Sequence, residues 1–406
     1  MVGERSGLRG RGLLVVMACF LCHMGLGFTY LPGALQADVT TELGLGRASY
    51  SAATQVRNYV VALASPGVGL LLVRFGARPV LAGGVAILCG AALCLSGARD
   101  WWGLVFSTLI LGIGLTAVGD VTVGHAVSRW VSRSRGSALG IVYTASNLGG
   151  MLLVPLVAGL SEAHSWREAL RFAGFGALGL LPFAALVRSP RHDEVASELD
   201  ASSEAHGVDM DLQQALRTRS FWILFFAHFA YFAYAVGVVE HFITYLRDAG
   251  VPRSEAANHW GRAIGLGIAS KLAFGFLSDR IPARHGMLIL LGAIALSSIL
   301  LILAPRQPFL WLFVIVFGFS YAARDVVTPL IVIDCFGLRY MAQIYGAIFP
   351  TLLLGGSAGA ILAGMCADWL GSYRPAFGGL AALNLAAFIL VLALRRERDL
   401  VSVTPP

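Results

Sequence analysis

The stretch Trp260–Arg280, WGRAIGLGIASKLAFGFLSDR, is apolar and glycine-rich enough for a helix in a lipid bilayer. It nevertheless contains Lys271, the only lysine in the sequence. A cation at membrane depth costs about 2.5–3.5 kcal/mol on insertion scales, so it usually faces a bundle interior or a wet cavity. The stretch then ends in a polar turn with Asp279 and Arg280. We therefore expect Lys271 to lie on the path of an anionic solute, inside a cavity formed by the other helices.

The composition is that of a polytopic membrane protein. Of 406 residues, 57% are hydrophobic and 13% are charged, about half the charged share of a soluble domain. The net charge of +7 comes from arginines scattered between apolar runs, which is typical of membrane topology and not of a nucleic-acid-binding face. The sequence therefore predicts contact with a lipid bilayer and no nucleic-acid partner.

No motif in the sequence favours an enzyme, a cofactor or a metal site. The six cysteines lie in or at the ends of apolar runs and predict no disulfide framework. Cys19, Cys22 and His23 have the spacing of a c-type haem attachment motif, but a membrane-length apolar run leaves no room for a covalent haem. Gly-x-Gly patterns lie inside apolar spans, and the dense small-residue patch Gly355–Ala360 reads as close helix packing.

Runs of about 20 apolar residues predict twelve membrane spans. They cover residues 13–35, 50–73, 79–97, 102–126, 136–160, 168–188, 220–245, 256–277, 286–304, 309–333, 340–366 and 373–394. The longest polar stretch divides six spans from six and reads as a cytoplasmic linker, with a short amphipathic helix near Asp211–Arg217. The predicted domains are an N-terminal bundle over 1–188, a linker over 189–219, and a C-terminal bundle over 220–406 that ends in a short cytoplasmic tail.

Arginine placement orients the chain, because cytoplasmic loops carry an excess of basic residues. With the N-terminus inside, 18 of the 30 basic residues lie in cytoplasmic segments, 8 lie on the opposite side and 4 lie within spans. We expect a multi-pass protein of the inner membrane, with both termini cytoplasmic, that acts as a monomer.

The two halves of the sequence echo each other in equivalent loops. Between spans 2 and 3 stands GLLLVRFGAR (69–78), and between spans 8 and 9 stands GFLSDRIPAR (275–284). These runs resemble the signature loops of the major facilitator superfamily, and the resemblance covers essentially the whole chain. It implies an all-α membrane protein with twelve transmembrane helices in two pseudo-symmetric six-helix bundles. It also implies that these loops act in the conformational change, and the residues that match are Arg74, Gly76, Arg78, Gly275, Asp279 and Arg280. One departure is Val73, which stands where the family's first loop has an aspartate that helps to latch the halves.

Shorter motifs resemble monocarboxylate transporters and oxalate/formate-type antiporters. Residues 129–140, RWVSRSRGSALG, look like the basic entry to their fifth span, and Ser270–Gly275 is similar to their span-8 run, in which an arginine precedes a glycine by four. That arginine is taken to meet the carboxylate substrate, so the resemblance gives this role to Lys271. Phe28-Thr29-Tyr30 with Pro32 is similar to their span-1 segment, although His23 and Gly33 stand where some members have an acidic residue and a lysine. The aspartate one turn before the cation in animal members is Gly267 here, and Asp325 is a candidate to replace it.

Polar residues at membrane depth are the candidates for chemistry. The proposed substrate contacts are Lys271, Arg324, Arg57, Tyr30, His23, Asn147 and Tyr143. The proposed proton-coupling carboxylates are Asp325 and Asp120. Asp325 is expected to meet Lys271 or Arg262. Arg324 and Asp325 are expected to pair poorly with each other, because adjacent helix residues point about 100° apart. A purely structural buried ion pair is the alternative for this group.

The sequence predicts a secondary active transporter that moves a small organic anion, most simply a monocarboxylate, by alternating access. A proton or a counter-anion is the expected coupled partner. Three alternatives stay open at this point: an efflux carrier for amphipathic compounds, a porter for a neutral or zwitterionic solute, and a transport-dead sensor or assembly subunit. The four cations and two carboxylates within the spans favour anionic cargo, and the short linker leaves little room for an accessory domain.

Overall fold

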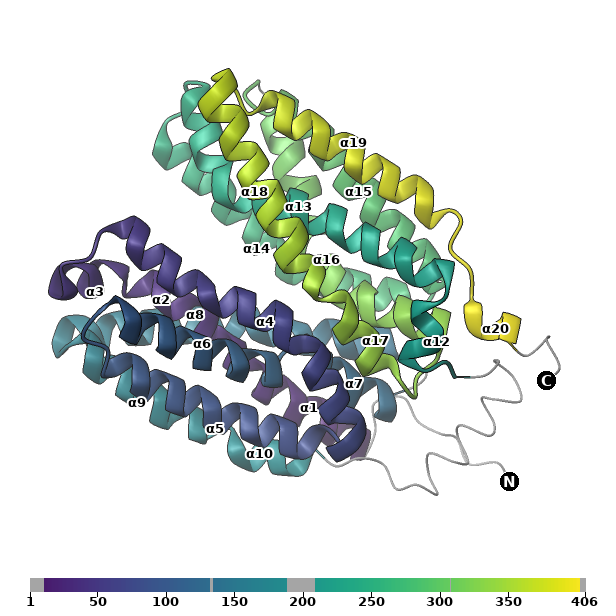
Figure 1. The fold of residues 1–406 in the computed structure, drawn as a ribbon, viewed down its shortest axis with the longest axis horizontal. Coiled ribbons are helices and arrows are strands. Elements are labelled where there is room, and N and C mark those ends of the chain that lie inside the picture. The colour runs from purple at the N-terminus through teal and green to yellow at the C-terminus, as the bar shows by residue number, and fades with distance from the viewer. Residues whose placement is uncertain (1–10, 132–133, 188–208, 307, 402–406) are drawn as a thin grey trace. The chain divides into compact units, whose positions relative to one another are not determined.

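The computed structural model describes residues 11–131, 134–187, 209–306 and 308–401. Across these residues the secondary structure is helical (Figure 1). The chain divides into two compact units, Met1–Ala196 with Tyr345–Ala347, and Ser197–Ile344 with Ile348–Pro406. The predicted linker falls mostly outside the described residues, as do its acidic side chains Asp193, Glu194, Glu198, Asp200 and Glu204, and Arg133 of the basic entry run.

The N-terminal half contains ten α-helices and one 3₁₀ helix in the described residues. They are α1 (Arg11–His23), η1 (Met24–Tyr30), α2 (Leu31–Ala34), α3 (Gln36–Leu43), α4 (Arg47–Phe75), α5 (Ala77–Ser96), α6 (Trp101–Val118), α7 (Asp120–Trp130), α8 (Arg135–Ala163), α9 (Trp166–Leu178) and α10 (Leu181–Leu186). Candidate membrane spans at Gly12–Tyr30 and Trp101–Trp130 overlap the predicted spans over 13–35 and 102–126, but neither is one regular α-helix. The first is interrupted after His23 and the second at Gly119, which is extended between α6 and α7.

The C-terminal half has the same plan of long helices joined by short turns. Its elements are α12 (Leu212–Leu216), α13 (Arg219–Asp248), α14 (Arg253–Ser278), α15 (Ala283–Leu303), α16 (Phe309–Phe336), α17 (Met341–Ile348), α18 (Pro350–Leu370), α19 (Arg374–Val391) and α20 (Glu397–Val401). The short helix expected near Asp211–Arg217 is present as α12. It begins with a capping box in which Asp211 accepts from the Gln214 backbone and the Gln214 side chain accepts in return.

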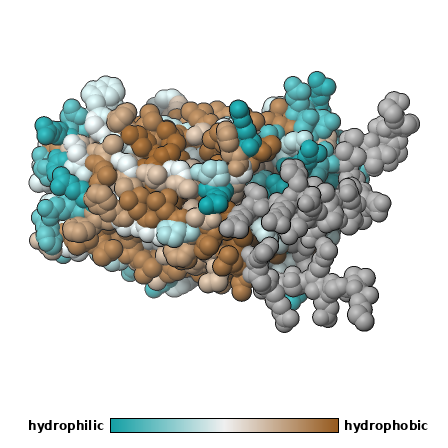
Figure 2. All heavy atoms as spheres, turned by 90° about the horizontal axis from the view of Figure 1, so that it is seen from below, coloured by the Kyte–Doolittle hydropathy of each residue, from teal (hydrophilic) through white to brown (hydrophobic). Residues whose placement is uncertain are grey.

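Eleven helical stretches among the described residues are long and apolar enough to cross a membrane. The twelfth expected span corresponds to α14, which falls short of that composition because Arg262 and Lys271 interrupt its apolar residues. Large apolar side chains such as Trp102, Met151 and Ile361 are exposed, and hydrophobic side chains dominate much of the face in Figure 2. Exposed apolar surface on this scale is what a lipid solvent requires of a helical protein.

Glycines set the closest helix contacts within the C-terminal unit. A Cβ added to Gly355 would lie 2.4 Å from the Phe229 carbonyl oxygen, and one added to Gly359 would lie 1.8 Å from the Ala233 carbonyl oxygen. Both contacts join α18 to α13, so any side chain larger than hydrogen would push the two helices apart. The close packing expected of the Gly355–Ala360 patch is confirmed.

Candidate functional site

A buried ion pair joins α14 to α16 in the C-terminal unit. The Lys271 ammonium nitrogen lies 2.9 Å from Asp325 Oδ2, and the two side chains are 6% and 16% exposed. Lys271 therefore points into the protein and not toward lipid headgroups. Of the two partners expected for Asp325, the structure selects Lys271.

Small residues bring α14 and α16 close enough for this pair to form. A Cβ added to Gly318 would lie 2.4 Å from the carbonyl oxygen of Ala263, and one added to Gly267 would lie 3.1 Å from the Ala322 Cβ. The Ser270 hydroxyl also donates to the Phe319 carbonyl oxygen, which ties the residue before Lys271 to α16. The absence of a side chain at Gly267 therefore lets α16 approach α14 closely.

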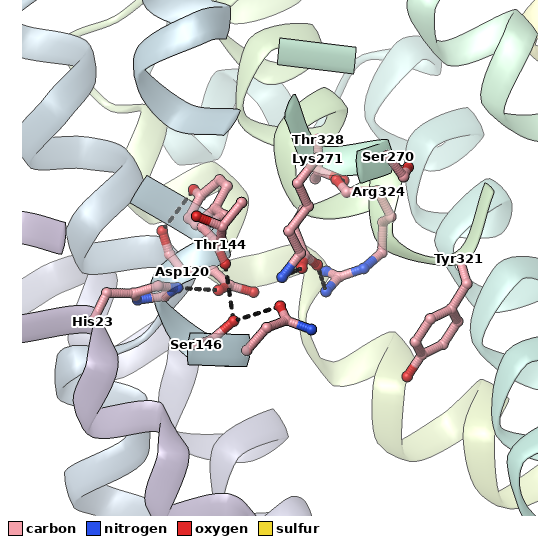
Figure 3. Close-up of polar contacts among 12 residues, drawn as sticks. His23, Asp120, Thr144, Ser146, Ser270, Lys271, Tyr321, Arg324 and Thr328 are labelled. Carbon is pink, nitrogen blue, oxygen red and sulfur yellow. Dashed lines mark hydrogen bonds and ion pairs between the residues drawn. The ribbon is translucent and has the colours of Figure 1, made fainter. Parts of the chain in front are cut away.

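Arg324 is the third member of the cluster, because its guanidinium bonds to Asp325 Oδ1. Figure 3 shows the side chains of Lys271 and Arg324 converging. The expectation that Arg324 and Asp325 would pair poorly is wrong. Successive positions do diverge by about 100°, but the arginine side chain is long enough to bend back to its neighbour. Lys271, Arg324 and Asp325, hereafter the cation cluster, carry two positive charges and one negative charge.

Aromatic rings hold the Arg324 guanidinium in place. Its central carbon lies 5.1 Å from the ring centre of Phe232, 5.8 Å from that of Tyr231 and 5.9 Å from that of Phe349. Such cation–π contacts favour arginine and keep its planar fork oriented. The Tyr231 hydroxyl also donates to the Tyr321 carbonyl oxygen, so the ring itself is fixed.

His228 supports the cluster from α13, and the sequence analysis gave it no role. Its Nδ1 lies 2.8 Å from the Leu224 carbonyl oxygen and its Nε2 lies 2.8 Å from the Thr328 hydroxyl. Thr328 in turn donates to the Arg324 carbonyl oxygen at 2.8 Å. The sequence shows only a histidine within an aromatic, apolar run. Its partner Thr328 lies 100 residues away, so the contact becomes apparent only in the folded structure.

The N-terminal unit contains a second polar group, which joins three of the predicted residues. His23 Nε2 lies 3.5 Å from Asp120 Oδ1, and Figure 3 shows the ring pointing toward Asp120. The Tyr143 hydroxyl donates to the Asp120 backbone oxygen at 3.1 Å, and its ring lies 5.4 Å from that of His23. His23 and Tyr143 are fully buried.

The other candidates in this unit make different contacts. Arg57 donates to the Thr54 carbonyl oxygen at 2.6 Å, and no carboxylate among the described residues lies within ion-pair distance of it. Tyr30 is 46% exposed, and its ring packs against Gly150. Asn147 is half-buried and accepts a hydrogen bond from Ser146 at 3.4 Å.

Residues of the signature loops lie at helix ends, as expected from their sequence positions. Gly76 has φ +78°, which favours glycine, and it separates α4 from α5. Arg74 contacts the ring of Phe75, and Arg280 lies over the ring of Phe276 beyond Asp279, which follows the last residue of α14. Arg78 lies in the first turn of α5, and Gly275 lies in the last turn of α14.

Comparison with known families decides the class of this protein. The family model described as Major Facilitator Superfamily matches residues 16–352 and, in a second match, 261–406. The chain belongs to the Major Facilitator Superfamily. Membership makes this facilitator a transporter and not an enzyme.

Transporters of known type share low sequence identity with this chain over most of its length. The facilitator is 24% identical to the oxalate:formate antiporter of Oxalobacter formigenes over 424 residues, which covers 99% of this chain and 97% of that one. It is 27% identical to monocarboxylate transporter 13 of Bos taurus over 340 residues, which covers 81% and 76% of the two chains. The two subgroups that its short motifs resemble are therefore both among its relatives.

Solved structures share the fold. The human organic anion transporter MFSD10 superimposes with a TM-score of 0.69 at 17% identity, over 94% of this chain and all of that one. The proton:xylose symporter XylE gives a TM-score of 0.72 at 13% identity, over 96% and 98% of the two chains. These likenesses confirm the twelve-helix architecture expected from the sequence.

Proposed function

We propose that this facilitator is a secondary active transporter for a small organic anion, most simply a monocarboxylate, and that the cation cluster is its binding site. The observation that carries the proposal is the convergence of two buried cations, Lys271 and Arg324, on the carboxylate of Asp325. Buried charges need compensation. A substrate carboxylate can take the place of Asp325 between the two cations.

The geometry supports an exchange of partners within the cluster. Asp325 contacts Lys271 through one oxygen and Arg324 through the other, in the way that a substrate carboxylate would contact both cations. The guanidinium keeps its orientation without Asp325, because aromatic rings hold it. A substrate carboxylate therefore competes with Asp325, and protonation of Asp325 frees both cations for it. This is the route by which Asp325 couples a proton to the anion.

Candidates in the N-terminal unit complete the proposed set. Arg57 is the proposed cation of this unit, and Tyr30, Tyr143 and Asn147 are its proposed polar substrate contacts. Asp120 is the proposed proton-coupling carboxylate of that unit, and the interrupted helices around it are typical of transporter binding regions.

The relatives favour the same class of cargo. One is named for oxalate and formate and another for monocarboxylates. An efflux carrier for cationic compounds would need acidic residues in excess, whereas the cation cluster has the opposite balance. The proposed location is the inner membrane, with both termini cytoplasmic.

A ligand-binding screen of the purified protein tests this function. Melting temperature is measured with formate, lactate and oxalate, with methylammonium, and with adenosine, because a ligand that binds the folded state raises it. We expect carboxylates to stabilise the wild-type protein and Lys271→Gln to abolish that shift. Stabilisation by methylammonium or adenosine, with no response to carboxylates, would contradict the proposal.

A further inference from the structure

Two interrupted helices meet in the N-terminal unit at His23 and Asp120. Helix α1 ends at His23 and the chain continues as the 3₁₀ helix η1. Helix α6 ends at Val118, and α7 begins at Asp120 after a single extended glycine. Interruptions of this kind expose backbone groups that a continuous helix would satisfy internally. The Val118 carbonyl oxygen is such a group, and it lies 3.1 Å from His23 Nδ1.

This contact determines which nitrogen of His23 is available for a proton. A carbonyl oxygen only accepts hydrogen bonds, so Nδ1 must carry hydrogen and donate to Val118. In the neutral ring Nε2 then presents a lone pair, and it faces Asp120 Oδ1 at 3.5 Å. Two acceptors that face each other at this distance repel. A proton between them turns that repulsion into an ion pair.

The N-terminal end of α7 favours the charge-separated form of the pair. Asp120 is the first residue of α7, where the helix dipole stabilises an anion. The side chains are 1% and 14% exposed, so solvent screens their attraction weakly. The protonated pair is therefore a histidinium and a carboxylate that join the two interruptions.

The surroundings of His23 add few other charges. Helix α1 packs against α7, α8, α10 and η1. Besides Asp120, the titratable and charged side chains of these elements and of α1 itself are His125, Arg129, Arg135, Tyr143, Glu162, Tyr30, Arg11, Cys19 and Cys22. Tyr143 contacts both members of the pair, as described above, and α10 contributes none.

We propose that the His23–Asp120 pair is a proton-binding site whose occupancy holds the interrupted helices of the N-terminal unit together. His23 accordingly acts as the proton acceptor and not as a substrate ligand. The proton arrives from water and binds to Nε2, and its release leaves two facing acceptors that push the ends of α1 and α7 apart. Proton binding follows from the geometry of this unit, whereas its use in driving transport rests on the proposed function.

The stability of the purified protein tests proton binding without any ligand. In the proposed site, the bound proton holds the two helices together in the folded protein. This contribution to stability is therefore greatest at low pH and is lost as His23 releases the proton. Melting temperatures are measured between pH 5 and 9 for the wild-type protein, His23→Gln and Asp120→Asn. The control is His164→Gln, which removes an exposed histidine that follows α8 in the same unit.

We expect both site variants to lose most of the pH-dependent shift, and the control to keep it. A wild-type pH profile in Asp120→Asn, or in a folded His23→Gln protein, would overturn the proposal. Asp120→Asn preserves the shape of the side chain, so it gives a result even where His23→Gln does not fold.

A second measurement tests whether proton binding at this site drives transport. Uptake of labelled lactate and oxalate into proteoliposomes is compared with and without an inward proton gradient. We expect the gradient to accelerate uptake by the wild-type protein and to have no effect on uptake by Asp120→Asn. Wild-type uptake that is equally fast with and without the proton gradient would overturn the proposed use of this site in proton coupling. A wild-type protein that moves neither anion would instead contradict the proposed function.

Discussion

Asp325 is the residue on which the charge balance of the cluster depends. Its two carboxylate oxygens contact both buried cations, Lys271 and Arg324. Removing one member of a buried ion pair leaves an uncompensated charge and costs about 3–5 kcal/mol. In the proposed function, the substrate and Asp325 are alternative partners for Lys271 and Arg324.

Asp325→Asn should lower the melting temperature of the protein, because Lys271 and Arg324 then lose the carboxylate that both contact. Lactate should restore more stability to this variant than it adds to the wild-type protein, since no carboxylate competes for the cations. The double variant Lys271→Gln/Asp325→Asn is the control and should recover part of the lost stability. An Asp325→Asn protein as stable as the wild type would show that the cluster is not under electrostatic strain.

At the scale of the element, the pairing of α14 with α16 places Lys271 against Asp325. Gly318→Ala puts a methyl group where only 2.4 Å separates it from the Ala263 carbonyl oxygen, and overpacking of this kind costs about 1–3 kcal/mol. We expect the variant to lose stability and its response to lactate, because α14 must move away from α16. The matched control is Gly265→Ala, where an added Cβ meets no atom within 4 Å. Equal behaviour of the two variants would contradict this account of the helix contact.

Glu42 lies on α3, outside the membrane spans, and ties this helix to the first residues of α9. Its carboxylate accepts from the Trp166 indole at 2.5 Å and pairs with Arg167 at 2.9 Å. The hydrogen bond from Trp166, together with Arg167, holds the pKa of Glu42 below its usual range. Stability from a lowered pKa is present above the unfolded value and is lost as the pH falls through the folded value.

Glu42→Gln should therefore be less stable than the wild type near neutral pH, and the difference should close in acid. The effect is small because the side chain is 48% exposed. Melting temperatures of both proteins from pH 7 to pH 3 check this prediction. A difference that stays constant over that range would exclude the ionised carboxylate as its cause.

The sequence reveals features that depend on composition and hides those that depend on side-chain reach. Lys271 stands out because a lone lysine interrupts an apolar run, and most spans follow from hydropathy. The interruptions at His23 and Gly119 do not, because hydropathy stays high through both breaks. The sequence does not reveal the bond from Arg324 to Asp325, because it depends on how the arginine side chain bends. It does not reveal the contact of His228 with Thr328 either, because the fold brings together two residues that are 100 positions apart.

At the scale of the whole molecule, the distribution of arginines predicts that both termini face the cytoplasm. A fluorescent protein fused after Pro406 should fluoresce, because it matures in the cytoplasm. Alkaline phosphatase fused at the same position should be inactive, because it matures only on the opposite side of the membrane. The predicted loop after the first span, near Leu45, should give the opposite pattern. An active phosphatase at the C-terminus would reverse the proposed topology.

The most direct test of the account is the uptake of labelled lactate and oxalate by proteoliposomes containing Lys271→Gln. Arg262→Gln is the matched control, because it removes a cation from the same helix that lies over the Trp311 ring, outside the cation cluster. Truncating a buried charge partner typically costs about 2–5 kcal/mol of binding. We therefore expect Lys271→Gln to lower uptake by at least about tenfold while Arg262→Gln keeps the wild-type rate. A well-folded Lys271→Gln protein that transports these anions at the wild-type rate would contradict the central role of Lys271.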